Sequence, residues 1–254
     1  MMRPSPRQVG QGCTLTNCPK TDRDTWRTSP APWHVEQVSK PVTHGVQIGV
    51  VARVCLVPVV ELDVGQPIWD RFFWVAPLVI IGTREPDGGH DLAPKHMVTP
   101  LGWKNYFGFV CTPRHRTFGN VQRVGAFTVT YPRPDQLVVT SLAASPRQDG
   151  QKPVLEYFTT FPGQTVHAPL IEEAYLYFEC RHFKSVDGFG PNCLITGEIV
   201  AAYAEPEFLR SSEIDDQELV HDSPLFAYLS PGRFAAIDKD KIVVGQAMVG
   251  NNPR

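Results

Sequence analysis

The chain has 254 residues, 42% of them hydrophobic and 20% charged, so it is long enough to bury one large core or two small ones. Its 24 basic and 26 acidic side chains give a net charge of −2, which leaves no general electrostatic case for nucleic acid or membrane as a partner. The 24 prolines favour strands, turns and loops over long helices.

Six cysteines are spread along the chain, and only Cys13 and Cys18 lie close together. Their segment CTLTNC lacks the second pair of Cys or His ligands that a zinc site needs. Cys55, Cys111 and Cys180 lie within apolar runs, where a thiol is usually a small core residue. We therefore expect reduced, intracellular cysteines. No apolar stretch is long enough to span a bilayer and no signal-peptide core is present, which predicts a cytoplasmic protein.

Residues 1–44 are rich in Pro, Ser, Thr, Arg and Gln and show no helical or strand period, so we expect a disordered or loosely attached extension. The domain is predicted at 45–238, followed by a C-terminal tail at 239–254. At its start, VQIGVVARVCLVPVVEL (46–62) predicts one or two strands. PIWDRFFWVA (67–76) predicts a short amphipathic helix or a turn.

The middle of the chain predicts short strands separated by turn residues. The Asp-Gly-Gly of a hairpin loop supplies positive φ between the first two of them. In chain order we expect a buried strand PLVIIGT (77–83), the hairpin loop REPDGGH (84–90), its partner strand DLAPKHMVTPLGW (91–103), a strand YFGFVC (106–111), a short helix FGNVQRV (118–124) and a strand GAFTVTYP (125–132).

The later part predicts a long hairpin: a strand at 169–186, a turn at 187–192 and an antiparallel strand at 193–204. Gly188 and Gly190 also suit a phosphate loop, but no helix or basic residue follows them, so the hairpin turn is preferred. Many short strands with Gly and Pro between them predict an all-β fold, a barrel or Greek key with a few short helices.

The common catalytic motifs are absent from the sequence. It contains no HExxH, no Walker glycine loop, no G-x-S-x-G and no Rossmann G-x-G-x-x-G. Glu172 and Glu173 are adjacent, and on a strand they point to opposite faces, which argues against a carboxylate dyad. No residue is therefore assigned a catalytic role.

The segment TPRHRTFGN (112–120) offers a different chemistry, the binding of an anion. Its hydroxyl and amide groups can hydrogen-bond a phosphate, its basic side chains add charge, and the following helix contributes free N–H groups. The residues concerned are Thr112, Arg114, His115, Arg116, Thr117 and Asn120. A solvated turn after a strand is the alternative interpretation.

A second polar group lies on the predicted strand 91–103, where Lys95, His96 and Thr99 stand among apolar neighbours. An unpaired lysine is costly to bury. Lys95 therefore either reaches solvent or faces an anionic or electron-rich ligand.

From PLVIIGT through GAFTVTYP the chain resembles the flavin reductase-like domain, the FMN-binding split barrel. Members of this family have a strand and hairpin, an apolar strand ending in an S-P-x-R-x-T loop, a helix and G-x-F-x-V. The segments APLIEEAYLYFECR, LITGEIVAAY and SPLFAYLSPGRFAAI are similar to its later strands and closing segment. The resemblance covers roughly residues 75–237.

This resemblance implies a split β-barrel of Greek-key type that binds FMN, with FAD as a variant, and takes hydride from NADH or NADPH. Electrons would pass to a flavin-dependent monooxygenase or another acceptor. Because the flavin performs the hydride chemistry, few catalytic side chains are needed. The family also implies a homodimer with the flavin near its interface. A flavoredoxin-like electron carrier is the alternative, and haem or another anion bound through His96 and His115 is a third.

The resemblance also implies site residues. Thr117 and Asn120 match residues that bind phosphate, and both Thr117 and Arg116 are expected on an exposed loop, where alanine would weaken FMN binding without disturbing the fold. Lys95, His96 and Met97 stand where the family lines the isoalloxazine with small residues and backbone N–H groups. The predicted cofactor-binding residues are Lys95, His96, Met97, Thr99, Thr112, Arg114, His115, Arg116, Thr117 and Asn120; the aromatic residues Trp103, Tyr106, Phe107 and Tyr228 either line the site or pack in the core.

Overall fold

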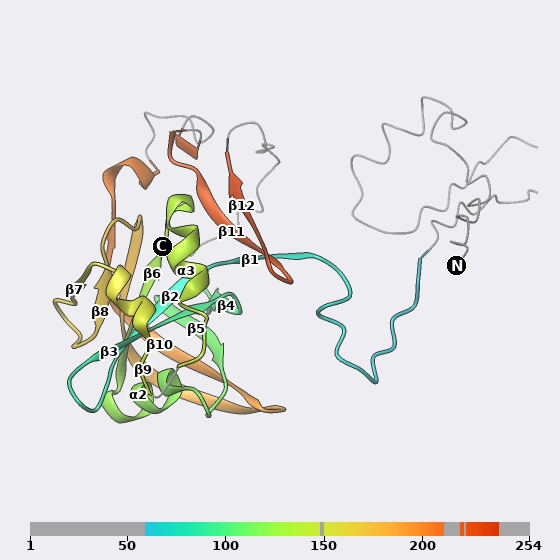
Figure 1. The fold of residues 1–254 in the computed structure, drawn as a ribbon, viewed down its shortest axis with the longest axis horizontal. Coiled ribbons are helices and arrows are strands. Elements are labelled where there is room, and N and C mark those ends of the chain that lie inside the picture. The colour runs from blue at the N-terminus through green and yellow to red at the C-terminus, as the bar shows by residue number, and fades with distance from the viewer. Residues whose placement is uncertain (1–58, 148–149, 211–218, 221, 239–254) are drawn as a thin grey trace, which may run out of the picture. The chain divides into compact units, whose positions relative to one another are not determined.

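The computed structural model describes residues 59–147, 150–210, 219–220 and 222–238 (Figure 1). The chain divides into two compact units, Met1–Asp63 and Val64–Arg254, and the account below concerns the second. The predicted extension, the predicted tail and most of the predicted strand at 46–62 lie outside the described residues. Residues 59–62 have no regular secondary structure.

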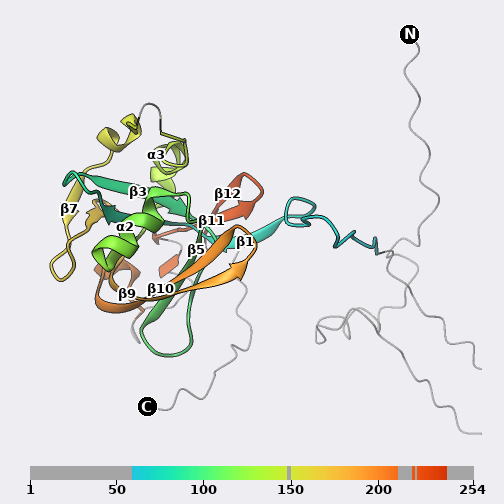
Figure 2. The same cartoon turned by 90° about the horizontal axis from the view of Figure 1, so that it is seen from below.

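Strands make up most of the described part of this unit, and the helices are short (Figures 1 and 2). The strands are β1 (Trp74–Pro77), β2 (Val79–Arg84), β3 (His90–Lys95), β4 (Val98–Pro100), β5 (Tyr106–Cys111), β6 (Ala126–Tyr131), β7 (Thr160–Pro162), β8 (Pro169–Ile171), β9 (Leu176–Phe189), β10 (Asn192–Ala204), β11 (Leu225–Ser230) and β12 (Arg233–Ile237). The helices are α2 (Arg116–Val124) and α3 (Leu137–Leu142), with 3₁₀ turns at Pro134–Gln136, Pro153–Tyr157 and Pro206–Phe208. Within the predicted helix or turn at 67–76, residues 69–72 form a turn and bends rather than a helix, and residues 74–76 belong to β1.

Seven strands form one antiparallel sheet in the order β3-β2-β6-β9-β10-β5-β4. Its two edge strands, β3 and β4, are consecutive in the chain and separated only by His96 and Met97. Two residues cannot cross a flat sheet of seven strands, which are about 4.8 Å apart. The sheet must therefore curl until its edges meet at His96 and Met97, and this closes the barrel.

The expected single strand over 91–103 is thus wrong, because it is two strands on opposite edges of the sheet. Pairing of β3 with β2 ends at Lys95, opposite Val79, where β2 begins. Beyond that point β2 offers no further partner, and the chain pairs instead with β5 through Val98, opposite Phe109.

The expected long strand at 169–186 is also interrupted. Glu173 has φ +62°, in the left-handed region, and residues 172–175 separate β8 from β9. This break allows β8 to pair with β7 while β9 pairs with β6 and β10. β8 lies so close to β2 that a Cβ on Gly82 would stand 2.2 Å from the Pro169 carbonyl oxygen, so only glycine fits there.

The core lies inside the curled sheet, where side chains from alternate strand positions meet. Phe109 and Phe127 pack edge to face with ring centroids 5.1 Å apart. The buried cluster consists of Val79, Ile81, Phe107, Phe109, Cys111, Val121, Phe127, Val129, Cys180, Cys193 and Ile195. Three cysteines in it are free thiols, as expected for Cys111 and Cys180.

The observed architecture confirms the prediction of an all-β barrel with a few short helices. A smaller sheet of order β1-β11-β12 and the β7-β8 hairpin complete it. Within the described ranges, no helix has the length and apolarity needed to cross a bilayer.

Candidate functional site

A cavity of about 220 Å³ opens where the two edges of the large sheet meet. We call it the closure cavity. It is lined by Pro94, Lys95, His96, Met97, Val110, Cys111, Thr112, His115 and Asn192. These residues come from the β3–β4 turn, the end of β5, the loop before α2 and the start of β10, and β3, β5 and α2 can be followed in Figure 2. Barrel closure therefore brings together five of the predicted site residues, Lys95, His96, Met97, Thr112 and His115.

The wall formed by the β5–α2 loop is held by backbone hydrogen bonds. Val110 N–H donates to the Met97 carbonyl at 2.9 Å, and His115 N–H donates to the Thr112 carbonyl at 3.0 Å. His115 caps α2 in an extended conformation without a side-chain cap bond. The first N–H groups of a helix have no carbonyl partner within it and carry partial positive charge. The residue that caps the N-terminus of α2, His115, thus lines the closure cavity.

Lys95 is the main charge of this cavity. Its side chain is half-buried, and it forms no ion pair within the part of the chain that the structure describes. Burial, and then the Lys95 charge, lower the pKa of His115. Burial raises the pKa of the Cys111 thiol, and the nearby Lys95 only partly offsets this. An uncompensated ammonium in a partly buried cavity favours an anionic ligand.

His96 connects the closure cavity to the small sheet. Its ring lies between Tyr228 of β11, with centroids 4.6 Å apart, and Trp74 of β1, at 5.7 Å. Burial, and then the charge of Lys95, lower the pKa of His96. The imidazole is therefore neutral at pH 7 and contributes a flat aromatic surface and a hydrogen-bonding group rather than charge.

This assignment predicts the titration of His96. Its midpoint, followed by ¹H–¹⁵N NMR of the imidazole, is expected below the ordinary value of 6.5. In Lys95→Gln the midpoint should rise but stay below 6.5, because burial is the larger cause. A wild-type midpoint at or above 6.5 would contradict the buried, neutral ring.

Thr117 differs from expectation because its side chain is buried in α2 rather than on an exposed loop, and Asn120, predicted to bind phosphate, is buried in the same helix. α2 begins at Arg116 rather than at residue 118, and Thr117 and Asn120 are 2% and 3% exposed. The Thr117 hydroxyl donates to Asp91 Oδ2 at 3.1 Å, and Asn120 Nδ2 donates to Thr83 Oγ1 at 3.0 Å. Their donors therefore attach α2 to β2 and β3.

Two buried carboxylates explain this arrangement. Glu85 and Asp91 are 6% and 4% exposed, and both accept hydrogen bonds from Arg147 Nη2, at 2.6 and 2.9 Å. Arg116 pairs with Glu85 at 3.2 Å, and Lys152 lies 3.7 Å from Asp91. We call these five residues the Glu85–Asp91 cluster. It fixes the first turn of α2 and with it the loop that carries Thr112 and His115.

No local signal in the sequence marks this cluster, because its members come from five places between residues 85 and 152. Arg116 is already engaged with Glu85, so the alanine variants expected to affect only FMN binding would also disturb this cluster. Of the remaining predicted residues, Arg114 is exposed on the loop and Thr99 is exposed on β4, with its hydroxyl donating to the Pro100 carbonyl. Neither lines the closure cavity.

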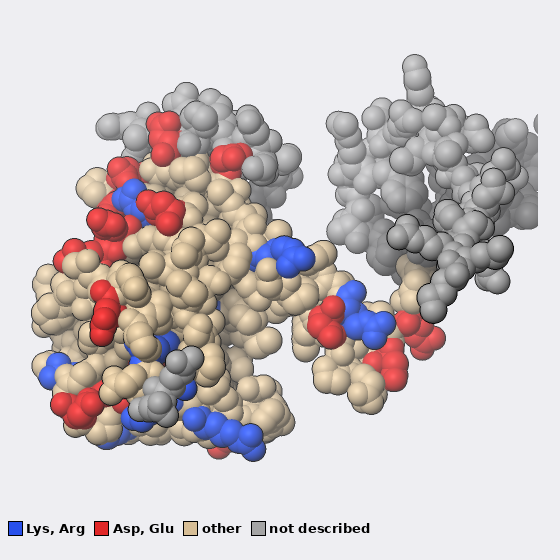
Figure 3. Space-filling view, in the orientation of Figure 1, with Lys and Arg blue, Asp and Glu red and all other residues tan. Residues whose placement is uncertain are grey.

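The four aromatic candidates differ in burial and in their contacts. Phe107 is 1% exposed in the core, whereas Trp103 is 76% exposed. Tyr106 packs against Phe183 at 5.2 Å, and Tyr228 packs against His96. On the face seen in Figure 3, Lys and Arg side chains gather mainly toward the end of the barrel where α2 lies in Figure 1.

Comparison with known proteins gives one family and many solved structures. The model of the flavin reductase-like domain matches residues 74–222. No curated protein matches the chain.

The fold is similar to that of flavoredoxin from Methanosarcina acetivorans, with a TM-score of 0.60, 20% identity and 77% of this chain aligned to 98% of that one. For an FMN-binding protein from Thermus thermophilus the TM-score is 0.60 and the identity 17%, with 74% of this chain aligned to 99% of that one. For nitrilotriacetate monooxygenase component B from Mycobacterium thermoresistibile the TM-score is 0.55 and the identity 17%, with 68% of this chain aligned to 86% of that one. At these identities the structural likeness concerns the fold.

Proposed function

Because the chain belongs to the flavin reductase-like domain family, we propose that it holds FMN at the closure cavity and acts as an NAD(P)H:flavin oxidoreductase. The observation that carries this proposal is the half-buried Lys95, which forms no ion pair with any described residue, beside His115 and the N-terminus of α2. These groups together suit the phosphate of FMN. Lys95 and His115 would hold the phosphate, and Met97 and His96 would lie beside the rest of the cofactor.

The protein's own contribution is binding and orientation. A bound flavin supplies the hydride-accepting chemistry, so the lack of a catalytic dyad or triad motif agrees with this function. The buried Glu85–Asp91 cluster holds α2 and the 112–115 loop in place. The neutral His96 ring packs at a tilt of 39° against Tyr228, which fixes its orientation at the cavity. Pre-organised groups of this kind lower the entropic cost of binding.

A homodimer is part of the proposal. The cavity of about 220 Å³ lies below the range of roughly 300–1,000 Å³ that is typical of cofactor sites. It suits the phosphate end of FMN, and a second copy of the chain would cover the remainder. Met97 at the cavity and Trp103 nearby in the chain are 40% and 76% exposed, which supports an interface on this side.

Two acceptors are compatible with this site. Transfer to a monooxygenase is supported by the likeness to a monooxygenase component, and electron carriage without turnover is supported by the likeness to flavoredoxin. Stopped-flow reduction of the FMN-loaded protein with NADH and NADPH separates the two. Rapid bleaching by either nucleotide indicates a reductase, and slow bleaching by both indicates a carrier.

The binding site is tested by titrating the purified protein with FMN and following flavin fluorescence. Lys95→Gln and His115→Asn are each expected to weaken FMN about ten- to hundredfold, because each removes one hydrogen bond to a charged group. Lys104→Gln changes an exposed lysine outside the cavity and should leave affinity within about twofold. A wild-type protein that fails to bind FMN, or equal effects at Lys95 and Lys104, would overturn the proposal.

A further inference from the structure

A second cavity, of about 170 Å³, lies at the other end of β3 from the closure cavity. We call it the hairpin cavity. It is lined by Arg84, Gly88, Gly89, His90, Thr160, Phe161, Pro162, His167, Ala168 and Pro169. The two cavities share no lining residue. His90 and Lys95 stand five positions apart on β3, about 17 Å in an extended strand. A ligand at the hairpin cavity is therefore separate from one at the closure cavity.

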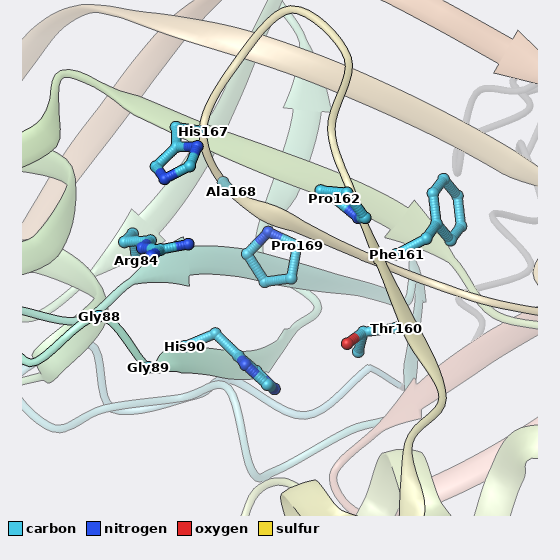
Figure 4. A pocket seen from close by; sticks show the side chains of 10 residues that line it. All are labelled: Arg84, Gly88, Gly89, His90, Thr160, Phe161, Pro162, His167, Ala168 and Pro169. Carbon is cyan, nitrogen blue, oxygen red and sulfur yellow. The ribbon is translucent and has the colours of Figure 1, made fainter.

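Three nitrogen-bearing side chains surround this opening. Figure 4 shows Arg84, His90 and His167 around the ring of Pro169, with the Thr160 hydroxyl on the side away from Arg84. Arg84 comes from the end of β2, His90 from the start of β3, and His167 from the loop between β7 and β8. The lining contains no carboxylate. Its polar side chains are thus a guanidinium, two imidazoles and a hydroxyl.

These nitrogen groups lack partners. The half-buried Arg84 guanidinium makes no ion pair or hydrogen bond within the described ranges, and His90 Nε2 is buried without a hydrogen-bond partner there. Of the nearby carboxylates, Glu85 and Asp91 are occupied by Arg147, and the exposed Asp87 accepts the Gly89 N–H at 2.9 Å. An orphaned buried nitrogen is costly unless a ligand or water satisfies it. The imbalance of charge favours an anionic ligand.

The walls of the hairpin cavity are held firmly. Arg123 Nη2 donates to the Arg84 carbonyl, which attaches α2 to the end of β2 and brings a second guanidinium to that side. The buried Glu179 carboxylate accepts the N–H groups of Gln164, Thr165 and Val166, immediately before His167. The imidazole of His167 is therefore presented from an ordered loop.

We propose that the hairpin cavity binds the phosphate group of a small phosphorylated molecule. Donors of Arg84 and His167, from two separate segments, line one opening together with His90 and the Thr160 hydroxyl, which suits the oxygens of a tetrahedral phosphate. A planar carboxylate is satisfied by one arginine alone. Two sources carry this chemistry: a free phosphorylated metabolite, and the 2′-phosphate of a nucleotide. The first would be a separate ligand, and the second would make this cavity a determinant of nucleotide choice.

The test is calorimetric titration with inorganic phosphate, without flavin. Because phosphate also suits the closure cavity, the titration is repeated in Lys95→Gln, where the hairpin site should remain. In that background, Arg84→Gln and His167→Asn should each weaken phosphate about tenfold or more. Arg181→Gln, an exposed arginine outside both cavities, should leave binding within about twofold. Circular dichroism verifies that each variant is folded.

Each outcome decides the matter. Loss of all phosphate binding in Lys95→Gln alone, or equal effects of Arg84→Gln and Arg181→Gln, overturns the proposal. If the hairpin site is present, adenosine 2′-phosphate identifies the source: binding about tenfold tighter than inorganic phosphate indicates a nucleotide, and equal affinity indicates a free phosphorylated molecule. Neither result depends on FMN, so failure here leaves the flavin proposal intact.

Discussion

Replacement of Glu179 by alanine is expected to lower the free energy of unfolding by about 3–5 kcal/mol, a large part of what a domain of this size possesses. The Glu179 side chain is fully buried on β9. It accepts three backbone N–H groups at 2.7–2.9 Å and the Tyr203 hydroxyl at 3.0 Å. Alanine leaves these donors unpaired and opens a cavity. Urea unfolding followed by circular dichroism measures the loss.

Glu198→Ala is the matched control. Glu198 is exposed on the neighbouring strand β10, so its removal should change stability by no more than about 0.5 kcal/mol. A loss below about 1 kcal/mol in Glu179→Ala would show that the loop at 164–166 does not depend on the carboxylate.

The same residue predicts a dependence on pH. Burial alone would raise the pKa of Glu179, but the N–H groups of Val166, Gln164 and Thr165 and the Tyr203 hydroxyl together lower it below 4.5. The folded state therefore binds this proton less tightly than the unfolded state. Its stabilising contribution is complete above the unfolded pKa and is lost as the pH falls through the folded value. Glu179→Gln should remove this part of the acid dependence while lowering stability at pH 7.

Arg147→Ala is the second substitution with a large expected effect, and it should lower the free energy of unfolding by about 3–5 kcal/mol. Arg147 donates to both Glu85 and Asp91, whose side chains are 7% and 5% exposed. Without it, Glu85 keeps only the half-exposed Arg116, and Asp91 keeps Thr117 and the more distant Lys152. Two buried carboxylates then face each other with too little positive charge. The measurement is again unfolding by urea.

Arg114→Ala is the control for this change. Arg114 is exposed on the loop before α2 and forms no ion pair in the ranges that the structure describes, so its loss should affect stability little. If Arg147→Ala and Arg114→Ala proved equally stable, the Glu85–Asp91 cluster would not be what holds α2 on β2 and β3. A folded Arg147→Ala should also bind FMN less tightly, since the 112–115 loop loses its support.

Each buried polar group thus positions one cavity. The Glu85–Asp91 cluster fixes α2 and the loop that carries His115 into the closure cavity. Glu179 fixes the loop that carries His167 into the hairpin cavity. Satisfied buried networks rigidify the elements that they join, and a binding site on such elements is pre-organised.

Local sequence patterns were sufficient for individual elements. The apolar run at 106–111 became β5 with the predicted bounds, and the segment at 125–132 contains β6. The Asp-Gly-Gly turn joins β2 to β3, with Gly88 at φ +90°. Lys95, as a basic residue among apolar neighbours, and His115, in the basic loop 112–120, are both predicted to bind an anion. Both line the closure cavity, and their binding of an anion stays a prediction.

The sequence by itself therefore determined the strand content, the turns and the residue types at the candidate site, because these depend on neighbours a few positions apart. Only the tertiary structure decided that 91–103 is two strands on opposite edges, since barrel closure is a property of all seven strands together. It also decided that Thr117 and Asn120 face inward. Their partners Asp91 and Thr83 lie 26 and 37 positions away, and a buried hydrogen-bonding group takes whichever partner the fold brings to it.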